Sequence, residues 1–112
     1  MSKTLSLSKT VPEDDERQKK WKKQRKRRGF DDTELWSLDC TIVAFILPRL
    51  KVFRKKIGSY PCELTFPAWK EILDKMITAF ELYKISFPNN DEAAKIQEGL
   101  DLFRKYFHHL WT

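Results

Sequence analysis

The 112 residues include 34% charged and 13% aromatic side chains, which allows at most one small domain with a modest core. The net charge of +6 is concentrated at one end. Residues 1–28 contain eleven Lys and Arg against four Asp and Glu, whereas residues 29–112 contain eleven against twelve. We therefore expect any partner selected by positive charge at the N-terminal end, and an ordinary near-neutral fold in the rest.

No apolar run is long enough to cross a bilayer. The longest, Cys40–Leu47, has eight residues, whereas a transmembrane helix needs about 20. Residues 1–10 also lack the apolar core of a signal peptide, so the sequence predicts a cytoplasmic protein with reduced thiols. Cys40 is expected to be buried in an apolar helix, and Cys62 to be exposed in a loop.

The N-terminal end divides into a tail and a basic helix. Residues 1–11 have no periodicity and are expected to be disordered, or ordered only by a partner. Residues 12–29 begin with a proline and four acids, continue with nine Lys and Arg within Arg17–Arg28, and end at Gly29. This order suits the helix dipole, so a helix over 12–28 is predicted. Trp21 is its only large apolar side chain, which predicts that the helix stays outside the core.

The most apolar stretch, Leu35–Phe53, is predicted to be a central helix with little of its middle exposed. Asp31 or Asp32 can cap this region, and Glu34 completes a capping-box pattern with Asp31. Pro48 falls inside the stretch and predicts a kink or a break, because proline lacks the backbone donor that a helix interior uses. A short basic continuation is expected after it.

Two further amphipathic helices follow. The first is capped by Thr65 and has a continuous apolar series at helical spacing: Trp69, Ile72, Leu73, Met76, Ile77, Phe80 and Tyr83. The second is capped by Asn90, contains Gly99 as a mild internal weakness, and has an apolar face of Ile96, Leu100, Phe103, Phe107 and Leu110.

No segment shows strand periodicity, and the loops have lengths typical of antiparallel helices. The predicted fold is therefore all-α, a small three- to four-helix bundle formed by a helical domain at residues 30–112. The basic helix of residues 12–29 would be a helical extension at its N-terminus.

The basic run is the strongest functional signal in the sequence. Clustered cations favour nucleic-acid phosphates without reading base sequence, and an aromatic among them could stack on a base. The short helix after Pro48 could extend this surface. The candidate residues for binding nucleic acid or an acidic partner are Arg17, Lys19, Lys20, Trp21, Lys22, Lys23, Arg25, Lys26, Arg27, Arg28, Arg54, Lys55 and Lys56.

Three other interpretations of the basic run remain open. Its partner could be the acidic surface of a protein, or the run could be a solvated helix that aids solubility. A membrane surface is the least favoured, because the cations are spread around the predicted helix rather than confined opposite an apolar stripe.

Catalytic signals are poor. His108 and His109 are adjacent, so on a helix they point about 100° apart and cannot bind one metal together. Cys62 has no supporting motif, and a charged Asp39 in the apolar helix is expected to bond a neighbouring Arg or Lys. We therefore expect no enzyme activity, no cofactor and no metal; an enzyme using Cys62 or the two histidines is the least favoured alternative.

The C-terminal end contains more aromatic side chains than one helix face can bury. Phe103 and Phe107 are expected in the core, which leaves Tyr106 and Trp111 as the candidate contacts with a protein partner. A second copy of the chain, forming a homodimer, or a groove on another protein would cover them.

The stretch from about residue 28 to 112 resembles a family of small uncharacterised proteins of bacteriophages and prophages. The resemblance rests on these segments: Gly29–Asp32, Leu35–Asp39, Ile46–Lys51, a Tyr-Pro loop, a Trp-containing helix and a Trp near the C-terminus. The basic run lies outside the pattern, and Cys40 stands where a tyrosine or similar residue is expected.

This resemblance implies an accessory protein acting in the cytoplasm of a bacterial host. It would be non-enzymatic and would bind a host macromolecular machine, with a nucleoprotein defence complex as the sharper possibility and CRISPR inhibition as its example. The alternative is a stand-alone DNA- or RNA-binding protein with a regulatory or packaging role.

Overall fold

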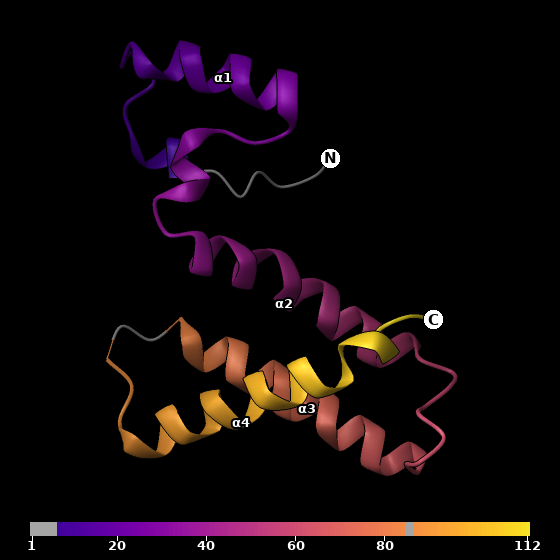
Figure 1. The fold of residues 1–112 in the computed structure, drawn as a ribbon. Helices are drawn as coiled ribbons and strands as arrows, with labels where there is room; N and C mark the ends of the chain where they lie inside the picture. The colour runs from indigo at the N-terminus through magenta and orange to yellow at the C-terminus, as the bar shows by residue number, and fades with distance from the viewer. Residues whose placement is uncertain (1–6, 85–86) are drawn as a thin grey trace. The chain divides into compact units, whose positions relative to one another are not determined.

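The computed structural model describes residues 7–84 and 87–112, and every regular element within them is helical (Figure 1). This confirms the all-α prediction. Residues 1–6 of the predicted tail lie outside the described part. The elements are the short 3-10 turns η1 (Leu7–Thr10), η2 (Asp32–Leu35) and η3 (Phe107–His109), and the helices α1 (Arg17–Arg28), α2 (Leu38–Lys56), α3 (Phe66–Tyr83) and α4 (Asn90–Tyr106).

The chain forms two compact units, Met1–Phe45 and Ile46–Thr112. The sequence predicted a division near residue 29, with the basic helix outside a domain of residues 30–112. In the structure α1 instead packs within the first unit, together with η1 and η2. The basic helix is thus part of a small folded unit. The prediction that it stays outside the core is wrong, because Trp21 is buried.

Helix α1 begins at Arg17, five residues later than predicted. The Asp15 carboxylate accepts a hydrogen bond from the Arg17 amide at 2.9 Å, a local turn that competes with helix geometry. The predicted end is confirmed. Gly29 has φ of +86°, which glycine adopts without strain, and its amide bonds the Arg25 carbonyl.

The segment Leu7–Thr10 is ordered as η1, contrary to the expectation of disorder through residue 11. Ser8 is only 4% exposed. The Gln18 side-chain amide donates to the Ser8 carbonyl at 2.6 Å and to the Val11 carbonyl at 3.0 Å, so α1 holds this segment in place.

Helix α2 runs through Pro48, so the predicted break is absent. Its apolar surface is less buried than the sequence indicated, because only Val43, Leu47 and Leu50 lie in the core. Cys40 is exposed, which corrects the expectation that it is buried. Six large apolar side chains of the stretch remain about half exposed: Leu35, Trp36, Leu38, Ile42, Phe45 and Val52.

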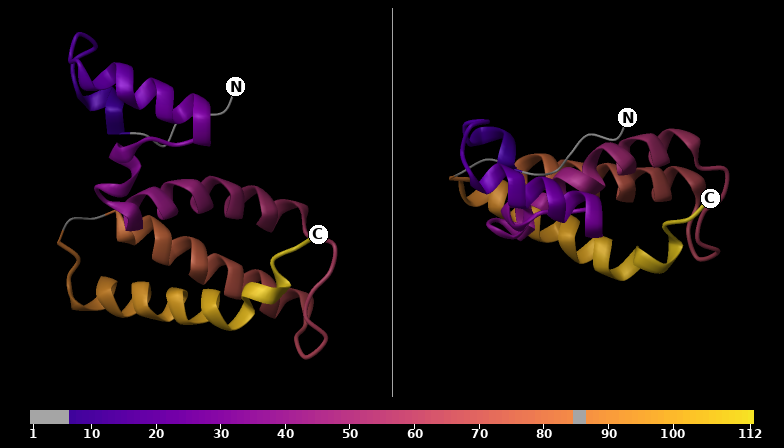
Figure 2. Two further views of the ribbon diagram at one scale, coloured as in Figure 1. Left: turned by 45° about the horizontal axis from the view of Figure 1, so that its top comes forward. Right: turned by 90° about the horizontal axis from the view of Figure 1, so that it is seen from above.

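The second unit is built around α3 and α4, which pack against each other and run in opposite directions (Figure 2, left). Thr65 caps α3 as predicted, and Asn89, one residue before the predicted Asn90, caps α4 with Glu92 in a capping box. Trp69, Leu73 and Met76 from α3 are fully buried, and Phe80 is 3% exposed. The predicted face of α3 is therefore the core of this unit.

Gly99 lies where α4 approaches α3 most closely. A Cβ at this position would overlap the Ala79 methyl and would lie 2.6 Å from the Lys75 carbonyl oxygen. The sequence suggested that this glycine merely weakens the helix. The structure gives it a packing role instead, because a side chain there would push the two backbones apart.

Candidate nucleic-acid interface

Trp21 anchors α1 to the first unit. Its side chain is 3% exposed, its ring meets the edge of Trp36 at a centroid distance of 5.7 Å, and the Arg17 guanidinium lies 5.2 Å from it. The predicted stacking of Trp21 on a base is therefore wrong. The ring is buried within the first unit, and it keeps α1 in a defined orientation.

A buried polar cluster lies on the same side of α1. Arg25 donates to the Asp31 carboxylate at 2.5 Å and to the Ser8 hydroxyl at 3.0 Å. Asp31 is fully buried, and it forms the predicted capping box with Glu34, although the element that it caps is η2. The charge of Arg25 is thus used inside the unit, since it compensates a carboxylate that has left water.

Asp32 holds the C-terminal half of α1. It accepts hydrogen bonds from Gln24 and Arg28, each at 2.9 Å, and pairs with Lys20 at 3.7 Å. The Gln24 hydrogen bond and then the Arg28 guanidinium hold the pKa of Asp32 below its ordinary value, because both favour the charged carboxylate.

Arg17 is also engaged, with the Asp15 carboxylate at 3.0 Å. The hydrogen bonds from Arg17 lower the pKa of Asp15, and the same contact raises the pKa of Arg17. Four of the nine cations of α1 therefore have an acidic partner within the unit: Arg17, Lys20, Arg25 and Arg28.

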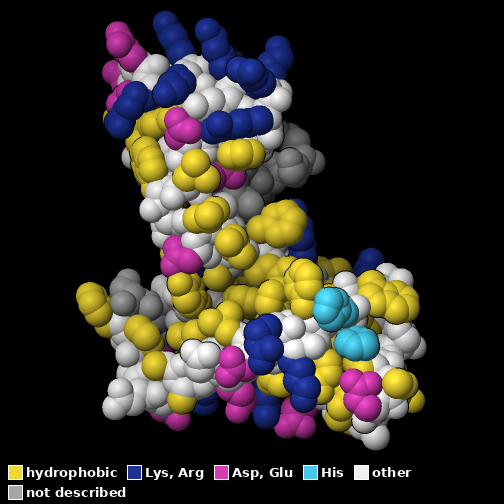
Figure 3. All heavy atoms as spheres, in the orientation of Figure 1, with side chains coloured by type: hydrophobic (Ala, Val, Ile, Leu, Met, Phe, Trp, Pro, Cys, Tyr) yellow, Lys and Arg dark blue, Asp and Glu magenta, His cyan; other side chains and the backbone are white. Residues whose placement is uncertain are grey.

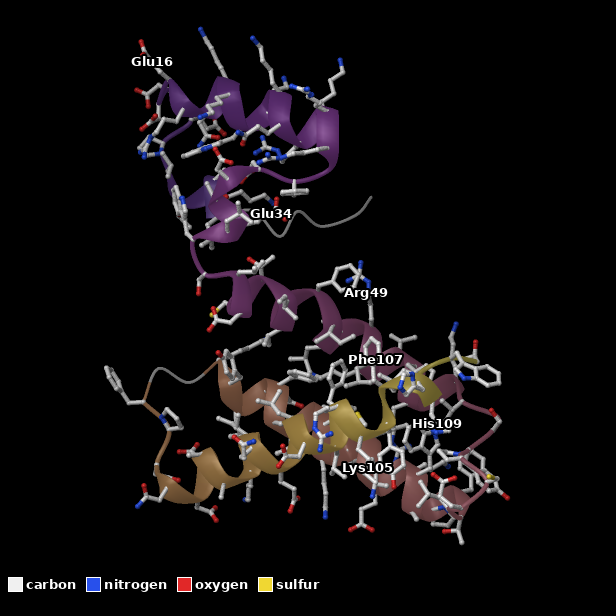
Figure 4. All side chains as sticks on the ribbon, viewed as in Figure 1. Glu16, Glu34, Arg49, Lys105, Phe107 and His109 are labelled. Carbon is white, nitrogen blue, oxygen red and sulfur yellow. The ribbon has the colours of Figure 1, made fainter. Side chains whose placement is uncertain are left out.

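The other five cations are exposed and make no hydrogen bond or ion pair with any described residue. At 100° per residue they occupy a continuous arc of about 140° that lies opposite Trp21. Lys and Arg side chains crowd α1 in Figure 3, and nitrogen-tipped side chains extend from it away from the labelled Glu34 in Figure 4. We call this surface the outer cation face; it consists of Lys19, Lys22, Lys23, Lys26 and Arg27.

The sequence contained a signal for this division that the prediction missed. Within Arg17–Arg28 the only residues without positive charge are Gln18, Trp21 and Gln24. They recur every three residues, so they share one side of the helix, and all three make the inward contacts described above. The cations were predicted to be spread around the helix, whereas those left without a partner are confined to one face.

The predicted basic extension on α2 belongs to the second unit. Arg54 pairs with Asp74 through two hydrogen bonds of 2.9 and 3.2 Å, and the carboxylate raises the pKa of this guanidinium. Lys55 and Lys56 are exposed and make no hydrogen bond or ion pair within the described residues. Two of the three predicted cations therefore remain available to a ligand, outside the outer cation face.

The two candidate protein contacts at the C-terminus differ in exposure. Trp111 is 67% exposed, but Tyr106 is 6% exposed and packs on Trp69 at a ring-centroid distance of 5.6 Å. Phe107, expected in the core, is 59% exposed and is labelled in Figure 4. The reason is that α4 ends at Tyr106 and η3 begins at Phe107, so the α-helical spacing no longer applies.

The residues considered for catalysis are dispersed. Cys62 is exposed, and its Sγ lies 3.6 Å from the Glu63 carboxylate. Asp39 is exposed and accepts a hydrogen bond from Ser37 at 2.9 Å. His108 is exposed and His109 half-buried. Within residues 7–84 and 87–112, no three His, Cys, Asp or Glu side chains converge on a point where they could hold a metal ion.

None of the helices in the described part of the chain combines the length and apolar character of a membrane span. Comparisons with protein-family models, curated proteins and solved structures found no match to this chain. The outer cation face is therefore the feature of the described residues from which a function can be proposed.

Proposed function

We infer that the protein binds the phosphate backbone of nucleic acid through the outer cation face of α1, and that it acts by binding rather than by catalysis. The observation that carries this proposal is that five of nine cations on one anchored helix are exposed, have no acidic partner among the described residues and share one side. Each phosphate that they neutralise releases condensed counterions, which gives affinity that depends steeply on salt.

The anchoring of α1 supports binding as a preformed surface. An isolated helix of twelve residues is marginal in water, and ordering it on a ligand would subtract from the affinity. Here Trp21 and the contacts of Arg25 and Asp32 order the helix within the unit. The cations are thus presented in a fixed arrangement before any ligand arrives.

The resemblance to bacteriophage proteins adds a biological setting, a bacterial host cell, to the proposal. An accessory protein that docks on a host nucleoprotein machine could use the outer cation face for the nucleic acid and Trp111 for the protein. This setting rests on the resemblance alone. An acidic protein surface is the competing partner for the cations, and the experiment below separates it from nucleic acid.

The test is equilibrium binding to a fluorescent 20-base-pair DNA across a salt series. For five phosphate contacts, log Kd should change with log salt concentration with a slope of about 4.5, so affinity falls about 500-fold between 50 and 200 mM salt. Replacing Lys19, Lys23 and Lys26 with Gln should lower the slope by about 2.7, and Gln preserves helix propensity.

The matched control replaces Lys84, Arg104 and Lys105 with Gln. These residues are also exposed, make no hydrogen bond or ion pair among the described residues, and remove the same charge from the second unit. The control should leave the slope nearly unchanged. Equal losses in the two triple variants would mean that binding follows net charge, and no binding of the intact protein to nucleic acid would leave an acidic protein as the partner.

A further inference from the structure

The cations of the outer cation face are arranged in two rows along α1. Lys19, Lys23 and Arg27 form one row, and Lys22 and Lys26 form the other. Within a row the residues are four apart, about 6 Å along the axis, and adjacent members of the two rows lie about 60–100° apart around the helix. A single nucleic-acid strand needs only one row, whereas two rows suit two backbones that flank the helix.

The dimensions favour a groove of B-form DNA. A helix with its side chains is about 10–12 Å across, and the major groove of B-DNA is about 12 Å wide and admits one helix. In that position the two rows would face the two phosphate backbones that line the groove. The major groove of A-form RNA is deep and narrow, so it does not admit a helix in this way.

The chemistry of the face disfavours single strands and base readout. Single-strand binders stack bases on aromatic side chains, but the only aromatic ring of α1, Trp21, is buried. Gln18 and Gln24, whose amides could read adenine, are bonded inward. Four of the five outer cations are lysines, which act on phosphates as point charges without directional readout.

We propose that the ligand of the outer cation face is B-form duplex DNA, bound without sequence preference by α1 lying in the major groove with one row of cations on each backbone. This inference rests on the proposed function and specifies its substrate. It predicts that both rows contribute to binding.

The first experiment compares four probes, each about 20 nucleotides per strand, at one salt concentration. They are two DNA duplexes of unrelated sequence, a single DNA strand and an RNA duplex. We expect the two DNA duplexes to bind equally, and each at least tenfold more tightly than the single strand or the RNA duplex. Equal or tighter binding of the single strand or the RNA would overturn the inference while leaving the proposed function intact. Failure of all four probes would overturn both.

The second experiment removes one row at a time. The double variant Lys22→Gln, Lys26→Gln and the double variant Lys23→Gln, Arg27→Gln each remove two charges, and each should lower the salt slope on duplex DNA by about 1.8. A loss confined to one of the two variants would mean that a single backbone is contacted, which contradicts the groove geometry. Circular dichroism of each variant checks that α1 remains folded.

Discussion

The two units are stabilised by different kinds of interaction. In the second unit, α3 and α4 bury an uninterrupted apolar face, with Leu73 and Met76 fully inaccessible. In the first unit, a buried tryptophan contacts Trp36, and Arg25 and Asp31 meet in a polar network. Apolar burial tolerates small adjustments, whereas a buried charge needs its partner in place.

This difference explains why the first unit carries the exposed cations. Helix α1 has no apolar stripe, so the first unit holds it by hydrogen bonds and ion pairs that use four of its cations. The remaining cations are left on the opposite side. The binding surface is therefore a consequence of how the unit folds.

Among the changes that test the difference between the two units, Asp31→Ala is expected to have the largest effect on stability. The change removes the cap of η2 and leaves Arg25 without its carboxylate, which should cost about 3 kcal/mol. Amide hydrogen exchange should show lost protection in α1 and retained protection in α3 and α4. The control Asp14→Ala, at an exposed carboxylate, should change stability by less than about 0.5 kcal/mol. Equal loss of protection in both units would contradict their separate stabilisation.

A smaller effect, confined to the second unit, is expected from Gly99→Ala. In an open helix this change stabilises by about 0.5–1 kcal/mol, but here the new methyl overlaps Ala79 and the Lys75 backbone, so we expect a loss of about 1–3 kcal/mol. Urea denaturation measures the change. Gly58→Ala is the control, since nothing lies within 4 Å of a Cβ at Gly58; a stabilising Gly99→Ala would show that the helices can separate freely.

The smallest effect on the stability of the first unit should come from lowering the pH. The pKa values of Asp15 and Asp32 are lowered by folding, so their stabilising contribution is present above the ordinary value of 3.8 and is lost as pH falls through their lower folded values. Amide NMR signals of α1 near Asp15 and Asp32 should therefore shift as the pH falls below 3.8. The double variant Asp15→Asn, Asp32→Asn should remove this change, and an unaltered acid response would exclude these carboxylates as its origin.

Most local features were predicted correctly, because short-range interactions decide them. The capping residues Asp31 and Thr65 and the helix end at Gly29 are confirmed, and so is the apolar face of α3. Each depends on residues within one or two helical turns. The predicted start of α1 was wrong because Asp15 forms a local turn with Arg17. The predicted exposures of Tyr106 and Phe107 were wrong because the chain changes to a 3-10 turn at Phe107.

Apolar content was a poor guide to burial. Leu35–Phe53 is the most apolar stretch, yet Ile42 and Phe45 are about half exposed, while Trp21 in the most basic stretch is buried. Burial requires a second surface at the right place, and that surface comes from segments distant in sequence.

By itself, the sequence determined an all-helical chain, the main caps and the location of its positive charge, because these follow from neighbouring residues. Only the tertiary structure decided which cations remain available. Asp31, Asp32 and Ser8 contact residues of α1 that are 6, 8 and 17 positions away in the sequence, and these contacts give the basic helix an occupied side and a free side.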